Sequence, residues 1–315
     1  MVVIMRTQKK KTSIASIKKK KGVKLFLLAL PSLALVFILH YMPLWGLALA
    51  FTDYKPSKGF DRMDWVGLKN FTMLFGNAVM RKNVLQSLWN TLGIQFWDYL
   101  LYPLPMFFAI FLNELRSNKF KKLIQTVSTL PHFLSWVIMY AIANALFSGS
   151  GLINSLLSDW GSSAKINILA TDKNVWLTQV LFAKWMGLGW GSIVFFSALA
   201  GIDQEMYDAA MVDGAGRMQR IRYITIPHLM PTFLVLFIMG IGKLLNTGVD
   251  QYFVFSNAMN AKYITTLDLY VYKLGIGNGM IPQGVAVGMM KSIIALLLFT
   301  IANTISKKVR GYGIA

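Results

Sequence analysis

Six long hydrophobic stretches, separated by shorter polar segments, make up most of the chain. They cover residues 25–50, 88–112, 123–147, 176–200, 223–246 and 284–306. Each is longer than the roughly 20 apolar residues that an α-helix needs to cross the hydrocarbon core of a bilayer. The pattern therefore predicts an all-α membrane protein with six transmembrane helices. It divides the chain into a basic tail at 1–24, a transmembrane domain at 25–306 and a second tail at 307–315.

The first stretch follows a basic segment, as the apolar part of a secretory signal peptide does. Ala48 and Ala50 even have the spacing of a cleavage site. The apolar part of a cleavable signal, however, is only about 7–15 residues long. The stretch at 25–50 is much longer, so we expect an uncleaved first transmembrane helix.

Lys and Arg are distributed unequally between the two sets of connecting segments. The segments 1–24, 113–122, 201–222 and 307–315 carry 9, 4, 3 and 3 of these residues, 19 in all. The longer segments 51–87, 148–175 and 247–283 carry 6, 2 and 2, only 10 in all. Positive charge near the ends of transmembrane helices favours the cytoplasmic side. We therefore expect both termini in the cytoplasm and the three longer segments outside.

The composition supports a membrane protein and excludes several other classes. Hydrophobic residues make up 55% and charged residues 14% of the chain, against about a quarter charged in soluble domains. The net charge of +19 could indicate a nucleic-acid partner, but Lys and Arg lie between apolar stretches rather than along one face. We expect no nucleic-acid partner. The absence of Cys excludes disulfides and Cys-based metal or redox sites.

The predicted cytoplasmic segment at 201–222 has the pattern of two short helices joined by a turn. Asp203 is a suitable N-cap for a helix over about 204–212, and Glu205 in its first turn complements the helix dipole. Gly214 and Gly216 permit positive φ and so a sharp turn. Ala209 and Ala210 would let another protein approach closely. A helix-turn-helix at the inner membrane face is suited to docking into a groove on a soluble partner.

The same segment resembles the signature of permease subunits in binding-protein-dependent ABC importers. That signature is Glu-Ala-Ala, three residues, Gly, nine residues, then Ile-x-Leu-Pro; here Asp208-Ala209-Ala210 precedes Gly214, and Ile224 precedes Ile226-Pro227. Asp replaces Glu and Ile replaces Leu, and both changes keep the chemistry. In that family the loop forms coupling helices that insert into the ATPase subunits. The resemblance implies an ATPase-coupling set of Glu205, Asp208, Ala209, Ala210, Asp213, Gly214 and Arg217.

The resemblance extends over almost the whole chain after the basic tail. The segments 40–43, 50–54 and 66–71, together with 286–288 and the following Lys291-Ser292, look like permeases of the oligosaccharide and polysaccharide branch. It implies the type I ABC importer permease fold in a bacterial inner membrane. The implied partners are membrane lipid, a second related permease, two ATP-binding subunits and an extracytoplasmic substrate-binding protein.

Four ionisable residues fall within the predicted transmembrane stretches: Asp98, Lys184, Lys243 and Lys291. A charge at the bilayer centre costs about 2.5–3.5 kcal/mol even on insertion scales, so these residues should face water or a partner. Counting along the helices places all four in the outer half of the membrane. One interpretation is a sugar pathway; the other is that Asp98 pairs with a Lys for structure and Lys243 reaches the surface.

The pathway interpretation adds two aromatic residues, Trp185 and Trp190, which could stack on sugar rings. We therefore predict a substrate pathway formed by Asp98, Lys184, Trp185, Trp190 and Lys291. Three Lys against one Asp would suit an acidic sugar, such as a uronate, better than a neutral one. The spacings of Gly187 with Gly191 and of Gly284 with Gly288 predict close helix packing.

No catalytic or cofactor motif is evident in the sequence. It has no G-x-x-x-x-G-K-[ST] phosphate loop, so ATP and Mg²⁺ should bind to partner subunits and not to this chain. His40, His132 and His228 are scattered and have no metal-ligand spacing, so we expect no metal site. Two other classes remain open: a membrane-embedded glycan or lipid transferase, and an ion-coupled secondary transporter. The first would need an acidic or His cluster at one face, and the second two related halves.

Overall fold

The computed structural model describes residues 24–161 and 166–310, and this part of the chain folds into helices without a β-strand. Of the predicted N-terminal tail at 1–24, only Lys24 lies within the described residues. Of the predicted C-terminal tail at 307–315, residues 311–315 lie outside them. The described residues contain six helical segments long and apolar enough to cross a membrane, as predicted. These are Lys24–Phe51, Ala78–Asn113, Trp136–Asp159, Val175–Ala200, Arg217–Ile241 and Ile281–Ile301.

Several of these segments contain breaks or changes in helix type. The first changes to a π-helix in η1 (Phe37–Tyr41) and then to a 3₁₀-helix in η2 (Met42–Phe51). The second consists of α3 (Ala78–Leu100) and α4 (Leu104–Asn113), and the fourth is α8 (Val175–Ala200). The fifth comprises α10 (Arg217–Arg220), η4 (Ile221–Thr225) and α11 (Ile226–Ile241), and the last lies in α15 (Ile281–Arg310).

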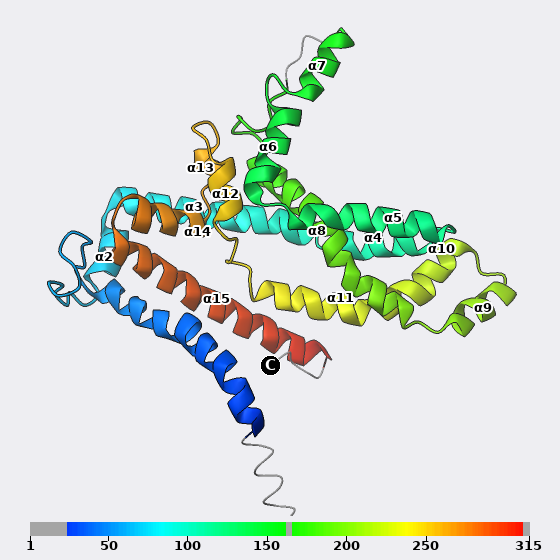
Figure 1. Ribbon diagram of the computed structural model, residues 1–315, viewed down its shortest axis with the longest axis horizontal. Coiled ribbons are helices and arrows are strands. Elements are labelled where there is room, and N and C mark those ends of the chain that lie inside the picture. The colour runs from blue at the N-terminus through cyan, green and yellow to red at the C-terminus, as the bar shows by residue number, and fades with distance from the viewer. Residues whose placement is uncertain (1–23, 162–165, 311–315) are drawn as a thin grey trace, which may run out of the picture.

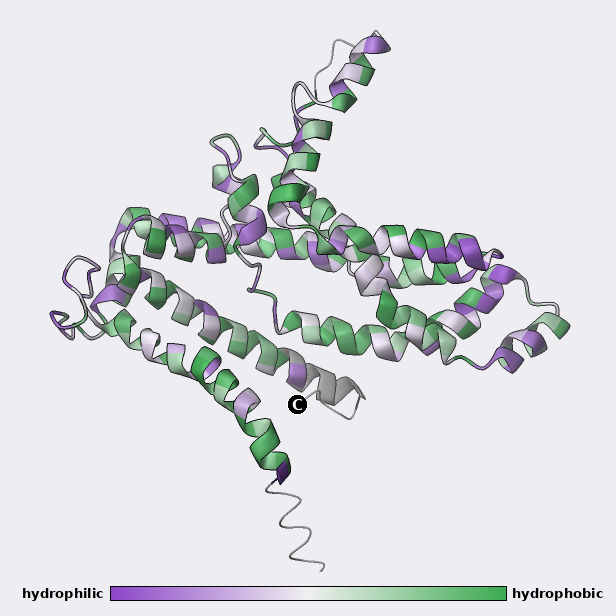
Figure 2. Ribbon diagram, in the orientation of Figure 1, coloured by the Kyte–Doolittle hydropathy of each residue, from purple (hydrophilic) through white to green (hydrophobic). Residues whose placement is uncertain are grey.

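Short helices fill the connections between the spans. They are α2 (Lys69–Gly76), α5 (Asn118–Thr129), η3 (Leu130–Phe133), α9 (Gln204–Val212), α12 (Asp250–Phe255), α13 (Ala261–Ile264), α14 (Leu267–Tyr272) and η5 (Lys273–Gly277). The third span, Trp136–Asp159, itself consists of two short helices, α6 (Trp136–Phe147) and α7 (Leu152–Asp159). The molecule is elongated, with α2 near one end and α9 at the other (Figure 1). The spans are mostly hydrophobic, and hydrophilic residues gather near both ends (Figure 2).

The second span begins at Ala78, about ten residues before the predicted position. Asn77 caps it, because the Asn77 side-chain oxygen accepts hydrogen bonds from the backbone N–H groups of Val79 and Met80 at 2.9 and 3.0 Å. The hydrophobic pattern missed this first part because it contains the polar run Arg81-Lys82-Asn83. Capping and helix propensity do not depend on hydrophobicity, so the helix extends beyond its apolar stretch.

The third stretch was predicted as one continuous helix over 123–147. This prediction is wrong, because the helix is broken in the middle of the stretch. The helix stops after α5, passes through η3 and an extended Leu134 with ψ 144°, and restarts at α6. Pro131 lies in the break, where it removes a backbone donor. Ser135 caps the new helix by accepting a hydrogen bond from the Ile138 N–H at 3.3 Å. As a result, α6 leaves the direction of α5 and extends sideways from the bundle with α7 (Figure 1).

The long helix α8 is the central element of the bundle and packs against α3, α4, α5 and α11. Its closest approach is at Gly189, where an added Cβ would lie 2.3 Å from the backbone of Ser128. The predicted close-packing pair at Gly187 and Gly191 is half right: a Cβ on Gly191 would lie 3.4 Å from the Pro105 ring of α4, whereas nothing lies within 4 Å of a Cβ on Gly187.

The second predicted glycine pair is half right. A Cβ on Gly284 would lie 3.0 Å from the Cα of Gly275, so α15 and η5 do pack closely there. Gly288 has nothing within 4 Å of an added Cβ. This contact joins the last span to the outer connection at 247–283, so that connection is part of the packed structure.

Candidate functional site

The segment at 201–222 has the predicted helix-turn-helix form, at one end of the molecule (Figure 1). The helix α9 begins at Gln204, and an Asp203 oxygen accepts a hydrogen bond from the Glu205 N–H at 3.0 Å, as predicted for an N-cap. Gly214 has φ of +77° and makes the turn, as predicted. Gly216 has φ of −67°, so the freedom expected of this second glycine is not used.

The surface of this segment offers both polar and apolar side chains to a partner. Four large apolar side chains are exposed, to 41, 48, 88 and 73%: Met206, Met211, Val212 and Met218. Among the predicted coupling residues, Ala210 is half-buried and the others are exposed, namely Glu205, Asp208, Ala209, Asp213, Gly214 and Arg217. Nothing lies within 4 Å of a Cβ built on Gly214, so a partner could approach this turn closely. Exposed apolar groups beside small residues are typical of a docking surface.

Two side-chain contacts connect this segment to the rest of the chain. The Tyr207 hydroxyl on α9 lies 2.9 Å from Oγ1 of Thr225, at the start of the fifth span. The Arg217 Nε lies 2.5 Å from a carboxylate oxygen of Glu114, and the Arg217 guanidinium also donates to the Glu114 carbonyl. Glu114 follows directly after α4. Arg217 is therefore engaged within the chain, where it links this segment to the C-terminal end of the second span.

Asp98 and Lys184, predicted to be part of the pathway, contact each other. The Lys184 Nζ on α8 lies 2.9 Å from a carboxylate oxygen of Asp98 on α3, and the side chains are 17 and 33% exposed. The same Nζ lies 5.7 Å from the centre of the Tyr102 ring. This is the pairing expected under the structural interpretation. The pair neutralises both charges, and its partial exposure leaves it accessible to polar ligands.

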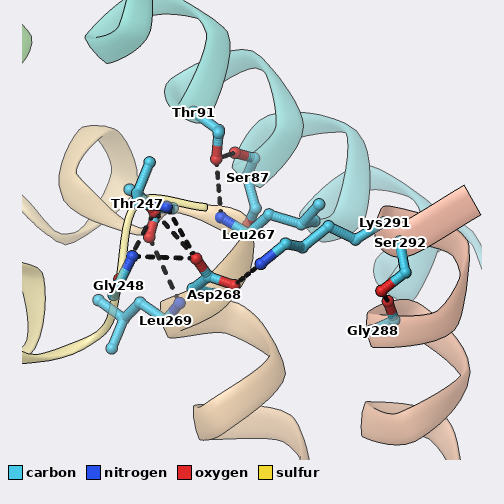
Figure 3. A network of polar contacts seen from close by, with 11 residues as sticks. Ser87, Thr91, Thr247, Gly248, Leu267, Asp268, Leu269, Gly288, Lys291 and Ser292 are labelled. Atoms are coloured by element: carbon cyan, nitrogen blue, oxygen red, sulfur yellow. Dashed lines mark hydrogen bonds and ion pairs between the residues drawn. The ribbon is translucent and has the colours of Figure 1, made fainter. Parts of the chain in front are cut away.

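Lys291 on α15 is paired with Asp268, which had been counted as part of an outer connection. The two side chains are only 13 and 16% exposed. The other oxygen of Asp268 accepts hydrogen bonds from the backbone N–H groups of Thr247 and Gly248, at 2.9 and 3.1 Å (Figure 3). Asp268 therefore joins the end of the fifth span, α14 and the last span. Sequence inspection missed it, although Lys291 required an anionic partner.

This second ion pair corrects the predicted charge balance. The excess of three Lys over one Asp becomes two neutral pairs and Lys243, which is exposed beyond the end of α11. Trp190 stacks on His132, with ring centres 4.5 Å apart, so one face of its ring is covered. Trp185 is 46% exposed. Lys291 and Asp268 line an apolar cavity of about 580 Å³ between η2, α14, η5 and α15.

Within the described parts of the chain, no group of three or more His, Asp or Glu residues could hold a metal ion. The sequence contains no phosphate-binding loop either. The described residues present two ion-paired polar clusters in the bundle and one exposed helix-turn-helix at the end of the molecule. This arrangement suits ligand passage and protein docking.

Residues 102–311 match the family described as the binding-protein-dependent transport system inner membrane component. The chain belongs to this family. It is therefore a multi-pass, non-catalytic permease subunit of an ABC importer, which confirms the family and the fold that the loop signature implied. The match includes all of the coupling segment and five of the six spans wholly or in part.

Individual members of the family match nearly the full length of the chain. Protein LplB of Bacillus subtilis is 38% identical, over 94% of this chain and 91% of its own length. YteP of the same organism, a polygalacturonan/rhamnogalacturonan transport system permease, is 34% identical over 99% of this chain and 96% of its own length. A chain of a solved bacterial ABC transporter that imports the acidic polysaccharide alginate has a TM-score of 0.82. It is 28% identical, and the match covers 92% of this chain and 97% of that one.

Proposed function

We propose that this permease imports an acidic oligosaccharide or polysaccharide, and that a uronic-acid glycan is its substrate. The observation that carries the proposal is the match along almost the whole chain to YteP, whose name refers to polygalacturonan and rhamnogalacturonan. The structural similarity to an importer of alginate, also an acidic polysaccharide, supports it independently. The ion pairs make Lys184 and Lys291 weaker support than the sequence suggested, because each positive charge already has a carboxylate partner.

The transporter would contain this chain, a second related permease, two ATP-binding subunits with ATP and Mg²⁺, and an extracytoplasmic binding protein. A solved alginate transporter in complex with a pentasaccharide-bound periplasmic protein supports the last of these. We place both termini and the 201–222 segment in the cytoplasm of a bacterial cell, following the distribution of positive charge. In this orientation the turn at Gly214 and the exposed residues of α9 dock on an ATPase subunit.

Coupling would proceed through the two contacts of this segment. When the ATPases close, α9 is displaced, and the Tyr207–Thr225 contact transmits the movement to the fifth span. The Arg217–Glu114 contact transmits it to the inner end of the second span, which carries Asp98. Because Asp98 is bonded to Lys184 on α8, relative movement of these helices would open or close a polar site for sugar hydroxyls.

Uptake into proteoliposomes tests the proposed substrate. The complete transporter with its binding protein should accumulate trigalacturonate with ATP and should not accumulate maltotriose, a neutral sugar of the same length. Lys184→Met and Lys291→Met test the pathway residues in the same vesicles. Loss of trigalacturonate uptake in these variants would support a place in the pathway. Failure of the wild-type transporter to import any oligouronate would exclude the proposed substrate.

The proposed docking surface can be tested by single-cysteine crosslinking, because the chain contains no Cys of its own. The Ala209→Cys variant should crosslink to a cysteine in the ATPase subunit. The Lys58→Cys variant, altered in the predicted outer segment, should not. Labelling of the Ala209→Cys variant by a membrane-impermeant thiol reagent added to intact cells would contradict the orientation.

A further inference from the structure

A second cavity, of about 600 Å³, lies among the predicted outer segments, away from the two ion pairs. It opens between the first turns of α3, the short helix α13 and η5. Lys82, Lys262 and Lys273 line it, together with the polar side chains of Asn83, Gln86 and Asn278. Lys82 and Lys262 are exposed and Lys273 is half-buried. Three separate elements thus bring three cationic side chains to one hollow, which we call the lysine pocket.

The lysine pocket has an excess of positive charge. No carboxylate side chain lines it, and within the described residues none of the three lysines forms an ion pair. The Lys273 Nζ donates a long hydrogen bond of 3.3 Å to the Ser256 hydroxyl, and the Lys262 Nζ lies 5.1 Å from the centre of the Tyr263 ring. Burial lowers the pKa of Lys273 from its ordinary value. A bound anion would stabilise the charged form of this side chain.

The walls of the lysine pocket are held in place by buried hydrogen bonds. Asn90 on α3 is fully buried and donates to the carbonyl oxygens of Lys262 and Thr265, at 2.8 and 2.9 Å. The Leu267 N–H donates to the Thr91 hydroxyl at 2.9 Å (Figure 3). These bonds fix α13 and the start of α14 against α3. The pocket is therefore preorganised, which lowers the entropic cost of binding a ligand.

We propose that the lysine pocket is an outer subsite that binds the carboxylate of a uronic-acid unit before the glycan reaches the ion pairs in the bundle. The proposal rests on the proposed function in requiring an acidic glycan. The cavity volume lies within the roughly 300–1,000 Å³ of small-molecule sites. Ammonium groups match the carboxylate, and the neighbouring amides match the sugar hydroxyls. A hollow of this size suits one or two sugar rings better than the convex surface of an acidic protein.

Zero-length crosslinking tests the contact directly. The complete transporter is incubated with trigalacturonate and a water-soluble carbodiimide, which joins a carboxylate to a neighbouring lysine amine, and the products are mapped by mass spectrometry. Sugar adducts are expected at Lys82, Lys262 or Lys273 more often than at Lys58, and none should form when the carbodiimide is left out. Adducts that are no more frequent there than at exposed Lys58 would overturn the proposal. So would adducts that join these lysines to the binding protein instead of the sugar.

A transport measurement gives a second readout. Lys82→Gln combined with Lys262→Gln should raise the KM for trigalacturonate about ten-fold with little change in kcat, because two charge-assisted contacts are lost. The matched control Lys58→Gln removes an exposed outer lysine outside the pocket and should leave the KM unchanged. Lys82→Arg with Lys262→Arg should restore most of the affinity, since the charges return.

The outcomes separate this inference from the proposed function. If wild-type protein imports trigalacturonate and the double Gln variant has an unchanged KM, the lysine pocket is not a subsite, although the substrate class stands. If the wild type imports no oligouronate, the substrate class itself fails. Lys273→Met provides a further check, since it removes the buried charge. Lys273→Met should raise the KM for trigalacturonate more than Lys273→Arg does. An equal rise in the two variants would contradict a role for the charge.

Discussion

The predicted coupling segment, residues 201–222, and the predicted outer connection, residues 247–283, are built in opposite ways. In the helix-turn-helix itself, the stabilising bonds are local: Asp203 accepts a hydrogen bond from the Glu205 N–H as the N-cap of α9, and the Ala215 N–H donates to the Ala210 carbonyl at 2.8 Å around the Gly214 turn. Its one long-range ion pair, from Arg217 to Glu114, is made by a side chain that is 59% exposed. In the outer connection, Asn90 bonds to residues that follow it by 172 and 175 positions. A locally built segment can change without disturbing the bundle. An outer connection held by long-range bonds cannot, and the predictions below follow from this difference.

The largest expected effect is on transport, in the coupling segment. Gly214→Asp should reduce ATP-driven uptake at least ~100-fold, equivalent to about 2.7 kcal/mol, because it adds a side chain and a charge at the turn of the proposed docking surface. The thermal unfolding temperature should stay close to that of the wild type. Gly214→Asn is the matched control, since Asn tolerates positive φ and adds no charge, and it should retain part of the uptake. Normal uptake by the Asp variant would refute the docking role.

The outer connection should show the reverse behaviour. Asn90→Leu leaves the part-buried carbonyl oxygens of Lys262 and Thr265 without their Asn90 donor and should lower the free energy of unfolding by about 2–4 kcal/mol. Thermal unfolding of the detergent-purified protein measures this change. Asn83→Leu alters an exposed Asn on the same helix and should change stability by less than about 0.5 kcal/mol. Equal stability of the two variants would show that the buried bonds are not needed.

The Asp268–Lys291 pair should contribute a smaller amount, which a double-mutant cycle can isolate. Asp268→Asn and Lys291→Met should each lower the free energy of unfolding by about 1–3 kcal/mol, because each leaves a buried charge without its partner. The double variant should be more stable than the sum of the two single effects predicts. Additive effects would mean that the two charges do not interact.

The smallest effect on stability is expected at Arg217. Its side chain is 59% exposed, so Arg217→Gln should change the free energy of unfolding by less than about 1 kcal/mol. Uptake should fall several-fold nevertheless, because the link to Glu114 transmits movement. The charge-reversed pair Arg217→Glu with Glu114→Arg should recover part of the uptake. If Glu114→Gln alone leaves uptake unchanged, the link is not part of coupling.

The same difference between local and long-range bonds explains what the sequence could predict. The six spans and the coupling helix were predictable, because hydrophobic length, an N-cap and a turn glycine act over a few residues. The break at Leu134 was missed because an apolar run conceals it, despite Pro131. The partner of Lys291 was missed because Asp268 lies in a polar connection that packs into the bundle only after folding. Gly189 could not be distinguished from Gly187 without knowing which face of α8 meets α5.

The first span, Lys24–Phe51, has consequences for how the subunit is produced. None of its most hydrophobic stretch is buried within this chain, and Leu28, Phe37 and Trp45 are 76, 62 and 82% exposed. Its C-terminal part packs, through η2, against α15 and α2. Lipid can cover such a helix after insertion, and so can a helix of another subunit. In the assembly proposed above, synthesis in step with the second permease would cover this helix, whereas an orphan copy would keep it exposed to lipid.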